Sequence, residues 1–333
     1  MYYTARFSQL TPYILPVGRS LSDDGGLTVD WSGSGFAMDV MAERVVIGLG
    51  PYASDNPSYL RVYIDGRPVS KHAVVTGAEK IVLEDFAPNE VFRRLEVILA
   101  SGHGGRVTFS EIELYGEAVG VGGRPEERKL RIEYIGDSLT CGYGALGGPH
   151  HRTYYAYEED VTAAYAHMTS ETLGASGRYT CWSGQGIVKN CNGETGTPMP
   201  LFFRRTLKSG PEDYDHSSWT PDIVVITAGT NDNGGGVSKE DFETGCRAFH
   251  AQIREVYPDA HIIWDYGVCN TVYCDTLESM VSDLGDPKAH YLRAVTMDFK
   301  SEVGSNGHPN ALYHRRFADQ LAKYIKENVL DRE

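Results

Sequence analysis

Hydrophobic residues in the first 123 positions gather in short runs rich in β-branched and aromatic side chains, with no long helical period. Asp65-Gly66, a hairpin signal, separates two of these runs. Many short strands divided by turns predict an antiparallel β-sandwich of jelly-roll type for residues 1–123. The predicted strands are RVVIGLG (44–50), YLRVYIDGRPV (59–69), EKIVLEDF (79–86), RRLEVILASG (93–102) and RVTFSEIELYG (106–116).

A Gly-rich and then charged segment, residues 119–128, is typical of a linker. We therefore place a domain boundary between residues 123 and 124, with a second domain over 124–333. Apolar runs follow that are typical of strands covered on both faces. They are RIEYIG (131–136), RYTCW (178–182), PDIVVITAG (221–229) and HIIWDYGV (261–268).

Helical periodicity alternates with these strands. Residues 158–174 form one predicted helix that ends at Gly174, a typical C-cap. Ser238 begins a capping-box pattern ahead of a second predicted helix. An amphipathic helix closes the chain. The alternation predicts an α/β fold, a doubly wound parallel sheet of flavodoxin-like order, in which ligands bind beyond the carboxyl ends of the strands. The apolar positions of the last two helices are Phe242, Cys246, Phe249, Ile253 and Val256, then Phe317, Leu321, Tyr324 and Ile325.

Charge and composition narrow the possible partners. The formal net charge is -14, which argues against nucleic acid because phosphate binding needs clustered Lys and Arg. No apolar run reaches about 18 residues, so no membrane span is expected. The first residues lack the basic start and apolar core of a secretory signal. We therefore expect a cytoplasmic protein, with a processed secreted chain as the alternative.

The six cysteines lack the C-x-x-C spacing of structural zinc sites. Reduced, buried thiols are the simplest interpretation. We therefore expect no metal site and no cofactor.

Ser138 follows the predicted strand 131–136 in the string IGDSLTCGYG. A hydroxyl there would leave the sheet edge and point into the ligand crevice, where a neighbouring base could activate it as a nucleophile. Taken alone, Gly-Asp-Ser could equally be a tight turn and helix N-cap.

Two further segments stand at corresponding places. Asn231, in TAGTND directly after the strand 221–229, could aim its amide at a developing oxyanion, or could simply form a turn. His308, in GSNGHPN, could reach back to Ser138 as a base, or could be an ordinary loop residue. The order of catalytic residues along a chain is free. Three such segments on one sheet edge favour a single site over three separate turns.

The strings GDSL (136–139), GTND (229–232) and HP (308–309) resemble the conserved blocks of GDSL/SGNH hydrolases. The longer IGDSLTCGYG, and WSGSGF (31–36) in the first domain, are similar to carbohydrate esterase family 2, a group of sugar O-acetyl esterases. That family joins an N-terminal β-sandwich to an SGNH domain, so the resemblance extends over nearly the whole chain.

The resemblance implies roles for individual residues. Ser138 would be the nucleophile and His308 the general base. The oxyanion would be held by the Ser138 N–H, the Asn231 amide and a glycine N–H, for which Gly184 fits best and Gly186 is the alternative.

The usual acid stands three residues before the histidine, where this chain has Ser305. A hydroxyl cannot stabilise an imidazolium by charge. Some family members similarly lack the acid, and a backbone carbonyl then orients the histidine, so we expect a Ser–His dyad. Glu302 is a possible acid substitute. Asp137, beside the serine, is expected to be structural.

The function implied by the resemblance is hydrolysis of acetyl esters on oligosaccharides derived from xylan or mannan. A lipase- or thioesterase-like GDSL enzyme is one alternative, and a catalytically weak carbohydrate-binding protein is another. Aromatic side chains could stack on sugar faces, although core packing is the commoner role. Residues considered for substrate contact are Tyr143, Trp182 and Asp232, with Trp219, Trp264 and Tyr273 as weaker candidates.

Overall fold

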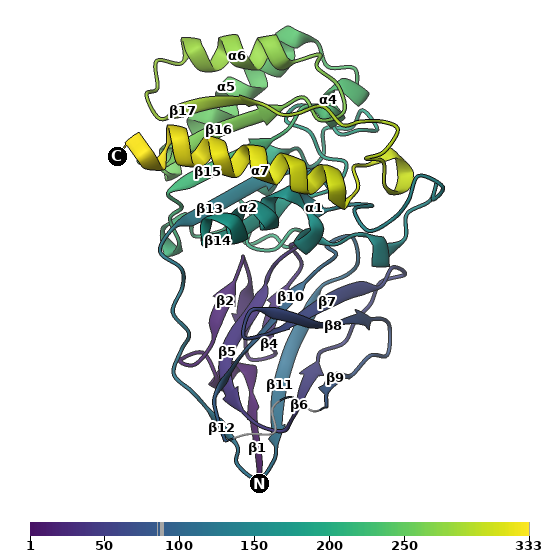
Figure 1. The fold of residues 1–333 in the computed structure, drawn as a ribbon, viewed down its shortest axis with the longest axis vertical. Helices are drawn as coiled ribbons and strands as arrows, with labels where there is room; N and C mark the ends of the chain where they lie inside the picture. The colour runs from purple at the N-terminus through teal and green to yellow at the C-terminus, as the bar shows by residue number, and fades with distance from the viewer. Residues whose placement is uncertain (85, 87–89, 333) are drawn as a thin grey trace. The chain divides into compact units, whose positions relative to one another are not determined.

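The computed structural model describes residues 1–84, 86 and 90–332 (Figure 1). Asp85, near the end of the predicted strand 79–86, lies outside the described residues. The chain divides into two compact units, Met1–Glu127 and Arg128–Glu333. Among the described helices, none combines the length and the apolar character needed to cross a membrane.

The first unit is a β-sandwich built from two antiparallel sheets within the described residues. One sheet has the order β3-β4-β11-β6-β9, with β1 also paired to β11, and the other the order β12-β5-β10-β7-β8, with β2 also paired to β5. Between them, Phe36 of β5 and Phe109 of β11 meet edge to face, with ring centroids 4.9 Å apart. The predicted β-sandwich is confirmed. The strands are β1 (Tyr2–Arg6), β2 (Leu15–Val17), β3 (Leu21–Asp23), β4 (Gly26–Val29), β5 (Gly35–Met41), β6 (Arg44–Leu49), β7 (Ser58–Ile64), β8 (Arg67–Val74), β9 (Lys80–Leu83), β10 (Arg93–Leu99), β11 (Val107–Tyr115) and β12 (Gly120–Val121).

Strand β5 was not apparent from the sequence, although it lies inside its sheet between β12 and β10. Its residues GFAMDVM begin with Gly and do not alternate, because nearly all of them are buried. Gly35 is required there, since a Cβ atom at this position would lie 1.9 Å from the Val97 carbonyl oxygen. Gly120–Val121, inside the segment that we interpret as a linker, also pair with β5.

The second unit is built on a parallel sheet of order β14-β13-β15-β16-β17, which is the predicted flavodoxin-like order. Helices α2 and α7 lie side by side over one face (Figure 1). On the other face, Phe249 of α5 contacts Trp264 of β16. The doubly wound prediction is therefore confirmed. The strands are β13 (Arg131–Gly136), β14 (Ser176–Cys181), β15 (Ile223–Thr227), β16 (His261–Tyr266) and β17 (Ala289–Arg293). The helices are α1 (Ser138–Cys141), α2 (Tyr165–Leu173), α3 (Met199–Phe202), α4 (Thr230–Gly234), α5 (Lys239–Val256), α6 (Cys274–Asp283) and α7 (Ala311–Asn328). The 3-10 turns are η1 (Phe7–Gln9) in the first unit and η2 (Ala156–Glu158), η3 (Val161–Ala163), η4 (His216–Ser218), η5 (Ser305–Gly307) and η6 (Leu330–Arg332) in the second.

Helix α5 begins as predicted, because the Ser238 side chain accepts a hydrogen bond from the Asp241 N–H. Helix α2 differs from the prediction of a helix over 158–174. It starts only at Tyr165, because the Asp160 carboxylate bonds the Thr162 N–H and hydroxyl and forms a separate 3-10 turn. It ends as expected at Gly174, which has a φ of 64°.

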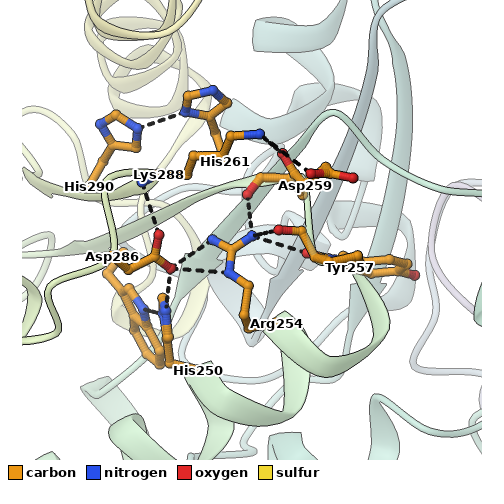
Figure 2. Close-up of polar contacts among 11 residues, drawn as sticks. His250, Arg254, Tyr257, Asp259, His261, Asp286, Lys288 and His290 are labelled. Carbon is orange, nitrogen blue, oxygen red and sulfur yellow. Dashed lines mark hydrogen bonds and ion pairs between the residues drawn. The ribbon is translucent and has the colours of Figure 1, made fainter.

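Arg254, near the end of α5, ties together the amino ends of β16 and β17 (Figure 2). Its guanidinium donates to the carbonyl oxygens of residues 257, 258 and 260 and to the Asp286 carboxylate. Asp286 also accepts from His250 at 3.0 Å and from the Lys288 N–H at 2.9 Å. This polar cluster stabilises the sheet edge opposite the carboxyl ends of the strands.

Candidate active site

Ser138 lies at the first turn after β13, where it is 7% exposed. Asp137 caps helix α1, and its Oδ1 accepts a hydrogen bond from the Leu139 N–H at 2.9 Å. Gly136 allows the turn, because a Cβ there would lie 2.1 Å from Oγ1 of Thr140. The Gly-Asp-Ser string is thus a helix cap, and the same cap presents Ser138 at the carboxyl edge of the sheet.

His308 contacts Ser138 directly, with Nε2 2.9 Å from Oγ. Its Nδ1 lies 3.2 Å from the carbonyl oxygen of Asn306. A carbonyl can only accept, so Nδ1 carries the proton and Nε2 is left to accept from the Ser138 hydroxyl. Burial lowers the pKa of His308, although the backbone hydrogen bonds at Asn306 and Ser305 oppose this shift. The imidazole is therefore neutral near pH 7 and ready to take a proton.

Tyr143 packs against the imidazole of His308, with ring centroids 4.3 Å apart. Its hydroxyl accepts a hydrogen bond from Nδ2 of Asn306 at 3.4 Å. Asn306 has a φ of 51° and Gly307 a φ of 76°, so two consecutive left-handed residues form the turn. Tyr143 is 8% exposed, and these contacts help to hold His308; its contact with substrate stays a prediction.

Asn231 lies near Ser138, at the start of α4 after β15. Its Nδ2 donates to Oδ2 of Asp137 and to the carbonyl oxygen of Gln185, each at 2.8 Å. An amide nitrogen has two hydrogens, so both are engaged here. Donation to an oxyanion requires one of these bonds to be exchanged. Burial raises the pKa of Asp137 to about 7, against the opposing hydrogen bond from the Leu139 N–H.

Asp232 is fully buried, unlike a substrate-binding residue. Its carboxylate accepts from the N–H groups of Ile187, Val188 and Lys189 at 2.9, 2.7 and 3.1 Å. It therefore fixes the loop after β14 and has no surface for the substrate contact that we considered. Burial raises the pKa of Asp232 against these opposing hydrogen bonds.

The loop held by Asp232 contains both candidate oxyanion glycines. The N–H of Gly186 donates to Oδ1 of Asn190 at 3.4 Å. A Cβ at Gly186 would lie 2.0 Å from the Lys189 carbonyl oxygen, so this glycine is needed for packing. Gly184 has a φ of 84°, and its carbonyl accepts from Cys191 at 2.9 Å. The Gly186 N–H is thus already bonded, and the assignment of Gly184 as the oxyanion donor stays a prediction.

Glu302 has a partner other than His308. Its Oε1 accepts from Arg316 at 2.7 Å, and its Oε2 accepts from the same guanidinium and from the Asp298 N–H. The hydrogen bond from Arg316 keeps the pKa of Glu302 low. Glu302 thus forms an ion pair with Arg316 and does not take the place of the missing acid that we considered.

The weaker aromatic candidates are core residues, since Trp219, Trp264 and Tyr273 are 4%, 0% and 1% exposed. Trp182 is half-buried and packs near Phe202. The predicted burial of the thiols holds for Cys141, Cys181, Cys246 and Cys274, whereas Cys191 is exposed and Cys269 half-buried. In the described part of the chain, no group of three or more His, Cys, Asp or Glu side chains could hold a metal ion.

Three features of this site were not predicted from the sequence. The Asn306 carbonyl is a main-chain group, which no residue type identifies. The Asn-Gly dipeptide at 306–307 is a turn signal that could have indicated its left-handed backbone. The Tyr143 contact joins segments far apart in the chain, so only the fold reveals it.

A serine bonded to a neutral imidazole, at the carboxyl edge of a doubly wound sheet, is the arrangement of the α/β serine hydrolases as a class. The model of the GDSL-like Lipase/Acylhydrolase family matches residues 134–327, and the chain belongs to this family.

Relatives extend the similarity across both units. Cellulase/esterase CelE of Acetivibrio thermocellus is 29% identical over 337 residues; the match covers 96% of this chain and 40% of that protein's length. An acetylxylan esterase / glucomannan deacetylase of Cellvibrio japonicus is 25% identical over 328 residues, covering 95% of this chain and 89% of the relative. The solved structure of a family two carbohydrate esterase from Clostridium thermocellum, in complex with cellohexaose, has a TM-score of 0.85 at 26% identity and covers 94% and 98% of the two chains. The predicted resemblance to carbohydrate esterase family 2 is confirmed.

Proposed function

We propose that this chain removes acetyl groups from oligosaccharides derived from plant polysaccharides, xylan or mannan, by a Ser–His acyl-enzyme mechanism. The observation that carries the proposal is the 2.9 Å contact between Ser138 Oγ and His308 Nε2, with His308 Nδ1 facing a carbonyl oxygen. The names of the relatives support an acetyl ester on a glycan as the substrate.

In this mechanism, His308 takes the proton of Ser138 as its oxygen attacks the acetyl carbonyl. The resulting oxyanion is held by the N–H groups of Ser138 and Gly184 and by Nδ2 of Asn231, which exchanges one of its present acceptors. His308 then protonates the departing sugar oxygen, and water repeats the cycle on the acetyl-enzyme. The mechanism uses no metal and no cofactor.

Mass spectrometry on acetylated xylo- and manno-oligosaccharides tests this proposal. We expect the wild type to release acetate from one of the two panels, and the purified Ser138→Ala and His308→Ala variants to release none. Full activity in either variant would overturn the assignment of the dyad. Turnover of neither panel by the wild type would overturn the substrate class.

A non-catalytic glycan-binding role is the second candidate, because a 26%-identical relative was solved with cellohexaose. It predicts binding of cello-oligosaccharides without turnover of a chromogenic acetate ester. The alternative lipase or thioesterase activity predicts faster cleavage of long acyl esters than of acetate.

A further inference from the structure

Ser305 stands three residues before His308, at the position where the family resemblance leads us to expect an acid. Its side chain is 1% exposed, and its hydroxyl donates a hydrogen bond to Oε2 of Glu158. Glu158, 147 residues earlier in the chain, therefore places a carboxylate beside Ser305, the position at which the expected acid is missing.

Glu158, the last residue of η2, is itself only 2% exposed. Its other oxygen, Oε1, accepts from Nδ1 of His151. Burying a carboxylate is costly unless it is well hydrogen-bonded, and the Ser–His chemistry does not use this one. The contact between Ser305 and Glu158 requires a glycine at position 147, because a Cβ there would lie 1.6 Å from Ser305 Oγ and 2.7 Å from Glu158 Oε2.

Main-chain bonds tie the histidine turn to the same segment. The Ser305 N–H donates to the Gly144 carbonyl at 3.1 Å, and the Asn306 N–H donates to the His151 carbonyl at 2.6 Å. The His308 N–H donates to the Ser305 carbonyl at 3.0 Å. A displacement of Ser305 would therefore move both the Asn306 carbonyl and the imidazole that it orients.

Titratable groups lie around His308 on three sides. Tyr143 packs on the ring, and burial raises its pKa, so it is neutral. His314 of α7 is fully buried, and burial lowers its pKa to about 3, so it is also neutral. The carboxyl groups nearby are Glu158, whose Oε1 faces His151, and the neighbouring buried Glu159, which accepts from a tyrosine hydroxyl at 2.7 Å. Of these two carboxylates, Glu158 is the one bonded to the histidine turn.

We propose that Glu158 is a positioning residue of the active site. Through the Ser305 hydroxyl it fixes the turn that presents the Asn306 carbonyl to His308, and its negative charge stabilises the imidazolium formed during reaction. Through Ser305 it thus supplies the orientation and the negative charge that an acid at residue 305 would supply directly. This inference rests on the proposed esterase function.

The test compares Glu158→Gln, Ser305→Ala and the double variant, using acetate-ester kinetics from acid to neutral pH. Glu158→Gln keeps the size of the side chain and an oxygen acceptor for Ser305 but removes the charge. We expect kcat to fall by about 10- to 100-fold with little change in KM, as for outer partners that orient metal-bound histidines. The acid limb of the kcat/KM profile should move to lower pH, because the imidazolium loses a stabilising charge. The double variant should be no worse than the poorer single variant.

The matched control is Glu133→Gln. Glu133, on β13, is another buried carboxylate, and it accepts a hydrogen bond from the Thr180 hydroxyl at 2.7 Å. It should keep the wild-type kcat and pH profile. A wild-type profile in Glu158→Gln, losses that multiply in the double variant, or a loss of activity matched by a loss of folded protein would each overturn the positioning role.

Failure of the proposed esterase function can be distinguished from failure of the positioning role of Glu158. If the wild type hydrolyses no ester, NMR titration of the His308 ring in wild type and Glu158→Gln still tests the inference. A lower imidazole pKa in the variant supports it, and an unchanged pKa overturns it.

Discussion

Nδ1 of His308 donates a hydrogen bond to the carbonyl oxygen of Asn306 at 3.2 Å. A peptide oxygen thus occupies the place that a carboxylate takes in a full triad. It sets the same tautomer, so Nε2 faces Ser138. It carries no full charge, however, and stabilises an imidazolium less than a carboxylate does.

Esterase activity should persist to a lower pH than an ordinary histidine base would allow. Burial lowers the pKa of His308, so its neutral, active form survives below the ordinary histidine pKa of 6.5. Measuring kcat/KM for a chromogenic acetate ester from about pH 4.5 to 8 checks this. A half-maximal point at or above pH 6.5 would contradict it.

Asn231→Ala should lower kcat by about 100- to 1000-fold, the usual cost of removing an oxyanion donor. KM should change less, because the donation matters mainly in the transition state. Asn233→Ala is the matched control, since Asn233 is exposed on the same short helix. A fall in kcat shared equally by both variants, or a fall only in KM for Asn231→Ala, would count against the oxyanion role.

His314 should make the protein less stable in acid. Burial lowers its pKa to about 3, with the nearby His308 adding to the effect, and its Nδ1 accepts from the Tyr165 N–H. The unfolded chain takes up this proton below about pH 6.5, so the stability is present above that pH and is lost as the pH falls. Between pH 7 and pH 5 the loss should be about 2 kcal/mol.

Urea unfolding at both pH values checks the His314 prediction. His314→Gln should show a smaller difference in unfolding free energy between the two pH values than the wild type does. His150→Gln, an exposed histidine, should keep the wild-type difference. Equal pH dependence in wild type and His314→Gln would refute the assignment.

Asp286→Asn should weaken the cluster of Figure 2 without affecting the chemistry. Burial alone would raise the pKa of Asp286, but hydrogen bonds from the Lys288 N–H, Arg254 and His250 outweigh it and lower the pKa. The charged carboxylate therefore stabilises the folded protein, and this stabilisation is lost as the pH falls from the unfolded value near 4 through the lower folded pKa. The unfolding free energy should drop by about 1–3 kcal/mol at pH 7.

The readouts for Asp286→Asn are chemical unfolding and kcat measured on the same samples. Asp259→Asn, at a nearby and largely exposed carboxylate, should change neither. Since Asp286 lies at the amino ends of the strands, a loss of kcat in the fully folded Asp286→Asn variant would show that the two sheet edges are coupled.

The fold was largely predictable where apolar residues follow a simple pattern along the sequence. Continuous apolar runs gave β13, β15 and β16, and the capping box at Ser238 gave the start of α5. Strand β5 was missed because a strand buried on both faces and begun by glycine shows no alternation. The start of α2 was predicted too early because helical spacing does not reveal the local competition of Asp160 for the Thr162 N–H.

The sequence alone determined the residue types and the order of the site: a serine after one strand, an asparagine after the next but one, and a histidine before the last helix. Strand periodicity and turn chemistry are local, so a linear pattern records them. Tertiary structure alone decided that Asn306 orients His308, that Tyr143 packs on its ring and that Glu158 stands behind Ser305. These contacts join main-chain groups and distant segments, and their geometry exists only once the loops at the sheet edge have folded together.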